Sequence, residues 1–213
     1  MPETWIAGAR RQLTPNRYAQ GHKYVAPVEL LVLHYTAGRT AAGAVAWLAN
    51  ADAKASAHLV VGHDGTTGPG GDLYQLAPLE DRTWHAGGGS SRWRGGPVNS
   101  RSIGIEIVNV GPLVRMGAGW ADWTGKAYAG PVHQDPAPGQ AWEAYPPAQL
   151  AKIRELVAFL VELYPVLGLQ DEGPGELPRI VGHQDVDPTR KVDPGPAFPM
   201  DEIRALARFH AAR

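Results

Sequence analysis

The side chains best suited to catalysis are two histidines, an aspartate and a lysine, gathered at two places in the chain. His34 ends the apolar run Leu-Leu-Val-Leu-His, and His183, Lys191 and Asp193 share a later segment that is stiffened by prolines. Two imidazoles and one carboxylate, with a fourth position left for water, form the ligand set of a catalytic zinc site. The sequence therefore predicts one Zn²⁺ ion bound by His34, His183 and Asp193.

A zinc hydrolase also needs a base and a positive group, and the chain offers a candidate for each. Glu106 lies in Ser-Ile-Gly-Ile-Glu-Ile, an otherwise apolar run in which a charge is costly unless it is paired or used. We therefore expect Glu106 to act as the base for the attacking water. Lys191 could stabilise the oxyanion, and a cation contributing ~3 kcal/mol there would raise the rate more than a hundredfold.

Each of these residues also has a structural interpretation. A lone histidine after a strand is commonly a structural side chain, and Glu106 could form an interior ion pair with Arg101 or Arg179. Lys191 could be a solvated charge, and Asp193, which precedes a proline, could cap a turn. Taken together the residues favour the zinc site, because one hypothesis explains all of them.

The other histidines rank lower. His58 in Ser-Ala-His-Leu and His85 in Thr-Trp-His-Ala alternate with apolar residues, as on strands. We expect them to contact the substrate or to orient the metal ligands. No role is assigned to His22, His63, His133 and His210.

Hydrophobic periodicity predicts an α/β protein with a mixed central β-sheet flanked by helices. The expected strands are 29–36, 58–63, 73–76, 83–86, 102–110 and 179–181, and the expected helices are 40–50, 147–167 and 199–210. We expect a single domain over 1–213, with an irregular arm at 1–27 and a long irregular tryptophan-containing loop at 111–146. Such a loop is commonly functional.

Composition excludes several classes of function. With a net charge of −1, the chain has no overall basic field that would bind nucleic acid or an anionic membrane surface. The absence of cysteine excludes disulfides and thiolate ligands, so any metal must be bound by His, Asp or Glu. No apolar run is long enough for a transmembrane helix, and the N-terminus does not resemble a signal peptide.

The chain resembles the type-2 N-acetylmuramoyl-L-alanine amidases, which include the AmpD-like enzymes, phage endolysins and the peptidoglycan recognition proteins. The resemblance covers roughly half of the chain, in the family's order. The matching stretches are 31–37, 56–59, 84–87, the Asn99–Glu106 run Asn-Ser-Arg-Ser-Ile-Gly-Ile-Glu, and 182–199.

The resemblance implies hydrolysis of the amide between the lactyl group of N-acetylmuramic acid and L-alanine. It implies zinc at His34, His183 and Asp193, proton transfer by Glu106, and oxyanion stabilisation by Lys191. Asn99, which begins one matched stretch, joins the residues expected to bind substrate or support the site. The long 111–146 loop departs from a minimal family member, and its tryptophans suit either packing or stacking on sugars and peptide.

Two alternatives remain open: a peptidoglycan-binding module without activity, and a zinc peptidase acting within the stem peptide. The second lacks the His-Glu-x-x-His motif. We expect a monomer made in the cytoplasm, either staying there to recycle muropeptides or, as a phage endolysin, reaching the cell wall.

Overall fold

The computed structural model describes residues 3–66, 72–87, 97–135, 140–169 and 178–213. Within them the main body is built on a mixed six-stranded sheet in the order β1-β5-β4-β7-β3-β13. These strands are β1 (Arg10–Arg11), β5 (Leu73–Gln75), β4 (Leu59–Val61), β7 (Ser102–Ile107), β3 (Leu30–Tyr35) and β13 (Ile180–Gly182). β3 runs parallel to both β7 and β13, and only the β4–β5 pair is antiparallel.

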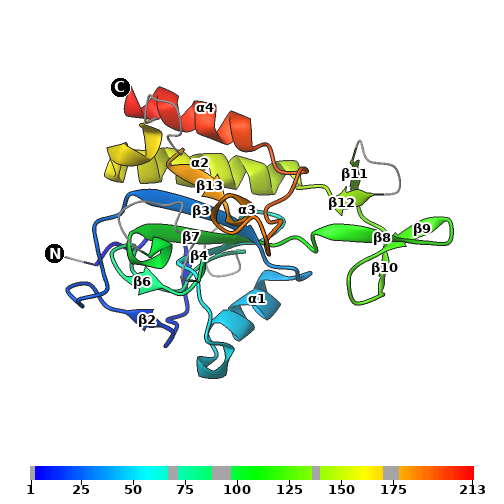
Figure 1. The fold of residues 1–213 in the computed structure, drawn as a ribbon, viewed down its shortest axis with the longest axis horizontal. Coiled ribbons are helices and arrows are strands. Elements are labelled where there is room, and N and C mark those ends of the chain that lie inside the picture. The colour runs from blue at the N-terminus through cyan, green and yellow to red at the C-terminus, as the bar shows by residue number, and fades with distance from the viewer. Residues whose placement is uncertain (1–2, 67–71, 88–96, 136–139, 170–177) are drawn as a thin grey trace.

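Helices cover both faces of this sheet, as expected for the predicted class (Figure 1). Helices α2 (Pro147–Leu163) and α4 (Met200–Ala211) lie together on one face, and α1 (Ala41–Leu48) lies on the other. The apolar stripe of α2 packs against odd-numbered strand residues such as Leu31, Leu33 and Ile105. Because each of those side chains is essentially inaccessible to water, this layer is the main hydrophobic core.

The pleat of two central strands decides which side chains point away from that core. Successive side chains on a strand point to opposite faces. In β3, Leu31 and Leu33 enter the α2 layer, so His34 points to the opposite face. The register pairs His34 with Glu106 on β7, which places both on the same face of the sheet. Two residues distant in sequence are thus brought side by side by strand pairing alone.

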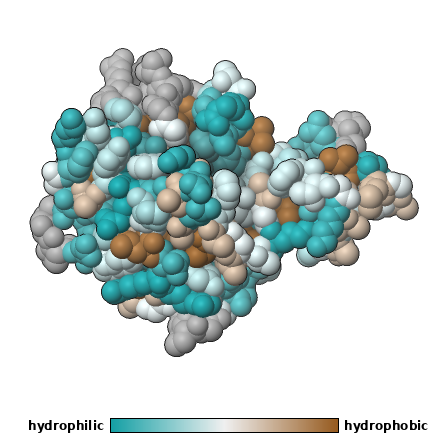
Figure 2. Space-filling model, turned by 90° about the horizontal axis from the view of Figure 1, so that it is seen from below, coloured by the Kyte–Doolittle hydropathy of each residue, from teal (hydrophilic) through white to brown (hydrophobic). Residues whose placement is uncertain are grey.

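The prediction of an irregular 111–146 loop is wrong. Among its described residues the segment forms a five-stranded antiparallel sheet in the order β10-β9-β8-β12-β11. The strands are β8 (Pro112–Met116), β9 (Gly119–Ala121), β10 (Ala127–Tyr128), β11 (Val132–Gln134) and β12 (Ala141–Glu143). We call this sheet the small lobe, and it projects from one side of the body (Figures 1 and 2). Its short strands, interrupted by glycine, leave no clear periodicity in the sequence.

Smaller differences lie at the ends of elements. The predicted irregular arm contains β1, and β2 (Arg17–Tyr18) pairs with β6 (Arg82–Thr83). The predicted 147–167 helix ends at Leu163 and is followed by a 3₁₀ turn. Further 3₁₀ turns are Ala51–Ala53 and Val98–Ser100, and His183–Val186 forms the short helix α3. The glycine- and serine-rich stretch 87–99, which the sequence suggests is a loop, lies largely outside the described residues. No helix in the described part of the chain is long and apolar enough to cross a membrane.

Candidate active site

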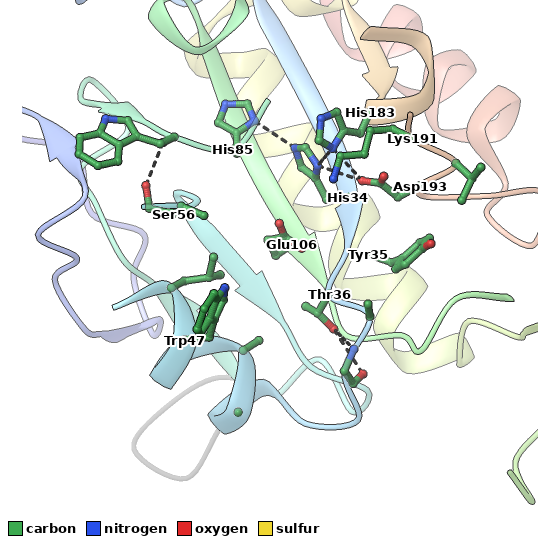
Figure 3. A pocket seen from close by; sticks show the side chains of 18 of the residues that line it. His34, Tyr35, Thr36, Trp47, Ser56, His85, Glu106, His183, Lys191 and Asp193 are labelled. Atoms are coloured by element: carbon green, nitrogen blue, oxygen red, sulfur yellow. Dashed lines mark hydrogen bonds and ion pairs between the residues drawn. The ribbon is translucent and has the colours of Figure 1, made fainter. Parts of the chain in front are cut away.

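Three buried side chains that are distant in sequence meet at the edge of the central sheet. His34 Nδ1 lies 2.9 Å from His183 Nδ1 and 3.0 Å from Asp193 Oδ2, and His183 Nδ1 lies 3.1 Å from the same oxygen. Among the described residues, these are the ones grouped closely enough to bind a metal ion together. The structure therefore brings together the three residues that the sequence predicted as ligands (Figure 3).

The local fold explains how His183 and Asp193 meet. β13 ends at Gly182, and α3 starts with His183 directly beside the end of β3. The backbone then returns, and Gln184 N–H donates to Asp193 O at 2.9 Å. A side chain at Gly182 would clash with this return, because a Cβ there would lie 2.6 Å from Pro194 Cδ. Tyr145 Oη–H donates to Pro194 O at 2.8 Å, which fixes the far end of the loop.

A chain of hydrogen bonds behind His34 fixes which of its nitrogens carries the proton. Ser102 Oγ–H donates to the carbonyl oxygen of Val98 at 2.7 Å, and a hydroxyl has only one proton to give. His85 Nε2, 3.0 Å from Ser102 Oγ, must therefore be the donor to it. Burial holds the pKa of His85 well below its usual value, so Nδ1 of this neutral ring is an acceptor. It accepts from His34 Nε2–H at 3.0 Å.

This relay, His34–His85–Ser102–Val98, leaves His34 Nδ1 with a lone pair directed at the other two ligands. Burial is the main cause that lowers the pKa of His34 to about 4, against the opposing effect of the neighbouring Asp193, so the ring is neutral at pH 7. Burial would raise the pKa of Asp193, but the neighbouring His183 and His34 hold it below its usual range, and the carboxylate is ionised. A lone pair and an anionic oxygen 3.0 Å apart repel each other unless a cation binds both. The donor set therefore fits a metal ion.

The candidate base lies beside these ligands. Glu106 is partly buried on the floor of the cleft, and burial, followed by the charge of Asp193, raises its pKa to about 8 against the attraction of Lys191. The interior ion pair considered from the sequence does not form. Arg101 donates to Glu29 at 2.7 Å and Arg179 lies 3.8 Å from the same carboxylate. Glu106 is thus left available for chemistry.

The ligands and Glu106 open into a cleft of about 490 Å³, within the usual size for a small-molecule site. Arg190 and Trp84 line this cleft. So do Lys191, from the Asp193 loop, and Trp47, on the opposite side (Figure 3). Trp47 is 58% exposed. Sequence reasoning did not identify Trp47, Arg190 or Ser102 as site residues. Ser102 could have been found, because it lies four residues before Glu106 and so shares its strand face.

The remaining candidates are placed away from the reacting atoms. His58 Nδ1 accepts from Gly104 N–H and from Thr83 Oγ1–H, both at 3.0 Å, and its Nε2–H donates to Asp81 O. Asn99 Oδ1 accepts from Ala86 N–H at 2.7 Å. Neither lines the cleft, whereas His85 does. His58 and Asn99 therefore hold strands and turns in place, and His85 supports a ligand.

Comparison with known proteins points to one family. Residues 24–196 match the family described as N-acetylmuramoyl-L-alanine amidase. N-acetylmuramoyl-L-alanine amidase AmiD of Escherichia coli is 30% identical over 132 residues, covering 62% of this chain and 36% of its own length. The E. coli 1,6-anhydro-N-acetylmuramyl-L-alanine amidase AmpD is 27% identical over 154 residues, covering 72% of this chain and 58% of its own length. The chain thus spans only part of the length of these relatives.

Two solved structures share the fold. One is E. coli AmiD in complex with the substrate anhydro-N-acetylmuramic acid-L-Ala-D-gamma-Glu-L-Lys, with a TM-score of 0.59, 25% identity, and coverage of 88% of this chain and 60% of that one. The other is AmpDh3 from Pseudomonas aeruginosa in complex with anhydromuramic pentapeptide. Its TM-score is 0.57 at 28% identity, and the match covers 92% of this chain and 66% of that one. Both hold a muropeptide in the corresponding fold.

Proposed function

The chain belongs to the N-acetylmuramoyl-L-alanine amidase family, and on that premise we propose that it hydrolyses the amide between the lactyl group of N-acetylmuramic acid and the L-alanine of the stem peptide. One observation carries the proposal. His34, His183 and Asp193 present three donor atoms to one point at the floor of a cleft that Glu106 and Lys191 also line. A binding module without activity would not need this set of groups together.

The metal we propose is zinc. Two imidazole nitrogens and one carboxylate oxygen are donors that zinc accepts in hydrolases, and the cleft leaves room for a water. When bound, zinc would acidify that water and polarise the scissile carbonyl. The cation would also lower the pKa of Glu106 from about 8 by electrostatic attraction, which favours the carboxylate form that can accept a proton.

The chain's own residues then move the protons. Glu106 accepts a proton from the attacking water as the water oxygen bonds to the carbonyl carbon. It returns the proton to the alanine nitrogen as the carbon–nitrogen bond breaks, so that a carboxylic acid and a free amine result. Lys191 supplies positive charge towards the carbonyl oxygen while that oxygen is negative. The relay behind His34 keeps its imidazole neutral and oriented throughout.

Mass spectrometry of the products from a soluble anhydro-muropeptide and from purified peptidoglycan tests this proposal. We expect free stem peptide with an L-alanine N-terminus, lost on treatment with a chelator and restored by zinc. Cleavage inside the stem peptide would instead support the peptidase alternative. Tight binding of muropeptide by zinc-loaded protein, without cleavage of either substrate, would support the binding module.

A further inference from the structure

The small lobe contains three tryptophans, and the structure divides them by role. Trp142 is only 8% exposed, and its ring packs near Tyr35 and against Gly195. Trp120 packs against the apolar cluster inside the lobe. Trp123, in contrast, is 64% exposed. The packing interpretation therefore explains Trp120 and Trp142, but it does not explain Trp123.

The turn that carries Trp123 is held firmly. Asp122 Oδ1 accepts from the backbone N–H groups of Thr124 and Lys126 and from the Thr124 hydroxyl. Its other oxygen, Oδ2, accepts from Arg39 Nε–H at 2.8 Å. Four donors on one carboxylate fix the backbone on both sides of the indole. An aromatic ring held this way loses little conformational freedom on binding a ligand.

Trp123 also lies at the edge of the cleft. Its Nε1–H donates to Ala37 O at 2.8 Å, and Ala37 lines the cleft three residues after the ligand His34. The hydrogen bond engages the polar edge of the indole and leaves ring surface open to solvent. Ala37 has a φ of 53°, a left-handed conformation that costs energy for a residue other than glycine unless its surroundings hold it. The lobe and the rim of the cleft are thus locked together at this point.

We infer that Trp123 is a sugar-binding platform that extends the cleft to the glycan strand of polymeric peptidoglycan. The inference rests on the proposed function, because it concerns how the same site selects its substrate. Indole faces stack on the apolar faces of sugar rings, and a rigid, exposed indole beside a cleft suits that contact. In this proposal the platform holds a sugar ring further along the strand than the ring that carries the scissile amide, so that a muropeptide with a single sugar ring leaves it empty.

Charge distinguishes the glycan from the stem peptide as the occupant. At the foot of the Trp123 turn, Arg39 and Asp122 neutralise each other. Lys191, which lines the cleft near the ligands, supplies positive charge from the Asp193 loop instead. An acidic stem peptide is drawn to that side. The sugar rings carry no charge while their lactyl groups are amide-linked to peptide, and they take the aromatic side.

The test compares Trp123→Ala and Trp123→Phe with the native protein on two substrates. Zinc-loaded protein is assayed for kcat/KM on sonicated peptidoglycan and on a muropeptide with one sugar ring. Phe209→Ala is the matched control, because Phe209 is 55% exposed on α4, away from the cleft. Binding of an N-acetylglucosamine tetrasaccharide, an uncharged stand-in for the glycan strand, is measured by titration calorimetry and gives a second readout that does not depend on hydrolysis.

We expect Trp123→Ala to lower kcat/KM on peptidoglycan by about three- to tenfold, the range of a single aromatic stacking contact, and to leave the muropeptide nearly unchanged. Trp123→Phe should retain much of the preference, and Phe209→Ala should alter neither substrate. Equal losses on both substrates would overturn the inference and show that Trp123 only supports Ala37. Cleavage of neither substrate, with tetrasaccharide binding still dependent on Trp123, would refute the amidase and keep the platform.

Discussion

Removing the acceptor behind His34 should weaken zinc binding without touching a ligand. In His85→Phe the ring shape is largely kept, but the His34 Nε2–H loses the nitrogen that lies 3.0 Å away. His34 is 1% exposed, so water cannot readily replace that partner. A buried donor left unsatisfied costs about 1–3 kcal/mol, and loss of such supporting contacts typically lowers metal affinity about 10–100-fold.

Two further variants separate this effect from general damage. Ser102→Ala leaves His85 in place but removes the acceptor of its Nε2–H, so His85 is free to change tautomer. The Ser102→Ala protein should therefore lose less zinc affinity than the His85→Phe protein. Gly104→Ala should resemble His85→Phe, because a Cβ at Gly104 would lie 2.4 Å from His85 Cγ and displace the ring. Zinc affinity is measured by competition with a chromogenic chelator, and circular dichroism verifies the fold. Native affinity in a folded His85→Phe protein would refute the relay.

Three other changes test separate parts of the site. Glu106→Gln should retain zinc and lose about 10²–10⁴-fold in turnover, and normal turnover in steady-state kinetics would exclude Glu106 as the base. Gly182→Ala should lower zinc affinity, measured by the same competition, because its Cβ would meet the Asp193 loop; unchanged affinity would contradict this. Burial lowers the pKa of His58 to about 4 in the folded protein, whereas the unfolded value is 6.5. The stability that the buried, neutral imidazole contributes is therefore complete above pH 6.5 and is lost as the pH falls towards 4. The stability advantage over His58→Gln in urea unfolding should shrink by about 3 kcal/mol across that window, and a constant difference would refute the assignment.

The ligand residues could be predicted from the sequence because their chemistry is unusual in its setting. A histidine after a buried strand, and a histidine and an aspartate in one proline-stiffened loop, predict a metal site before any contact is known. The central sheet was also predictable, since Leu30–Leu33 is a continuous apolar run and Ile103–Ile107 is apolar apart from Glu106.

What the sequence did not predict depends on register and on weak periodicity. The relay requires His85, which lies just after β6, to reach His34 and Ser102 at once, and only the tertiary fold decides this. The small lobe was missed because its strands are two to five residues long and alternate poorly. The distinct position of Trp123 could not be predicted either, since the sequence shows three similar tryptophans and not which one the lobe leaves exposed.

The most direct test of the central claim is a zinc titration of metal-free protein while release of stem peptide from an anhydro-muropeptide is measured. If His34, His183 and Asp193 form the catalytic metal site, activity rises in proportion to added zinc and reaches its plateau at about one ion per chain. Asp193→Ala should shift or abolish that rise. Full amidase activity in protein shown to contain no metal, or an unchanged titration of Asp193→Ala, would contradict the account.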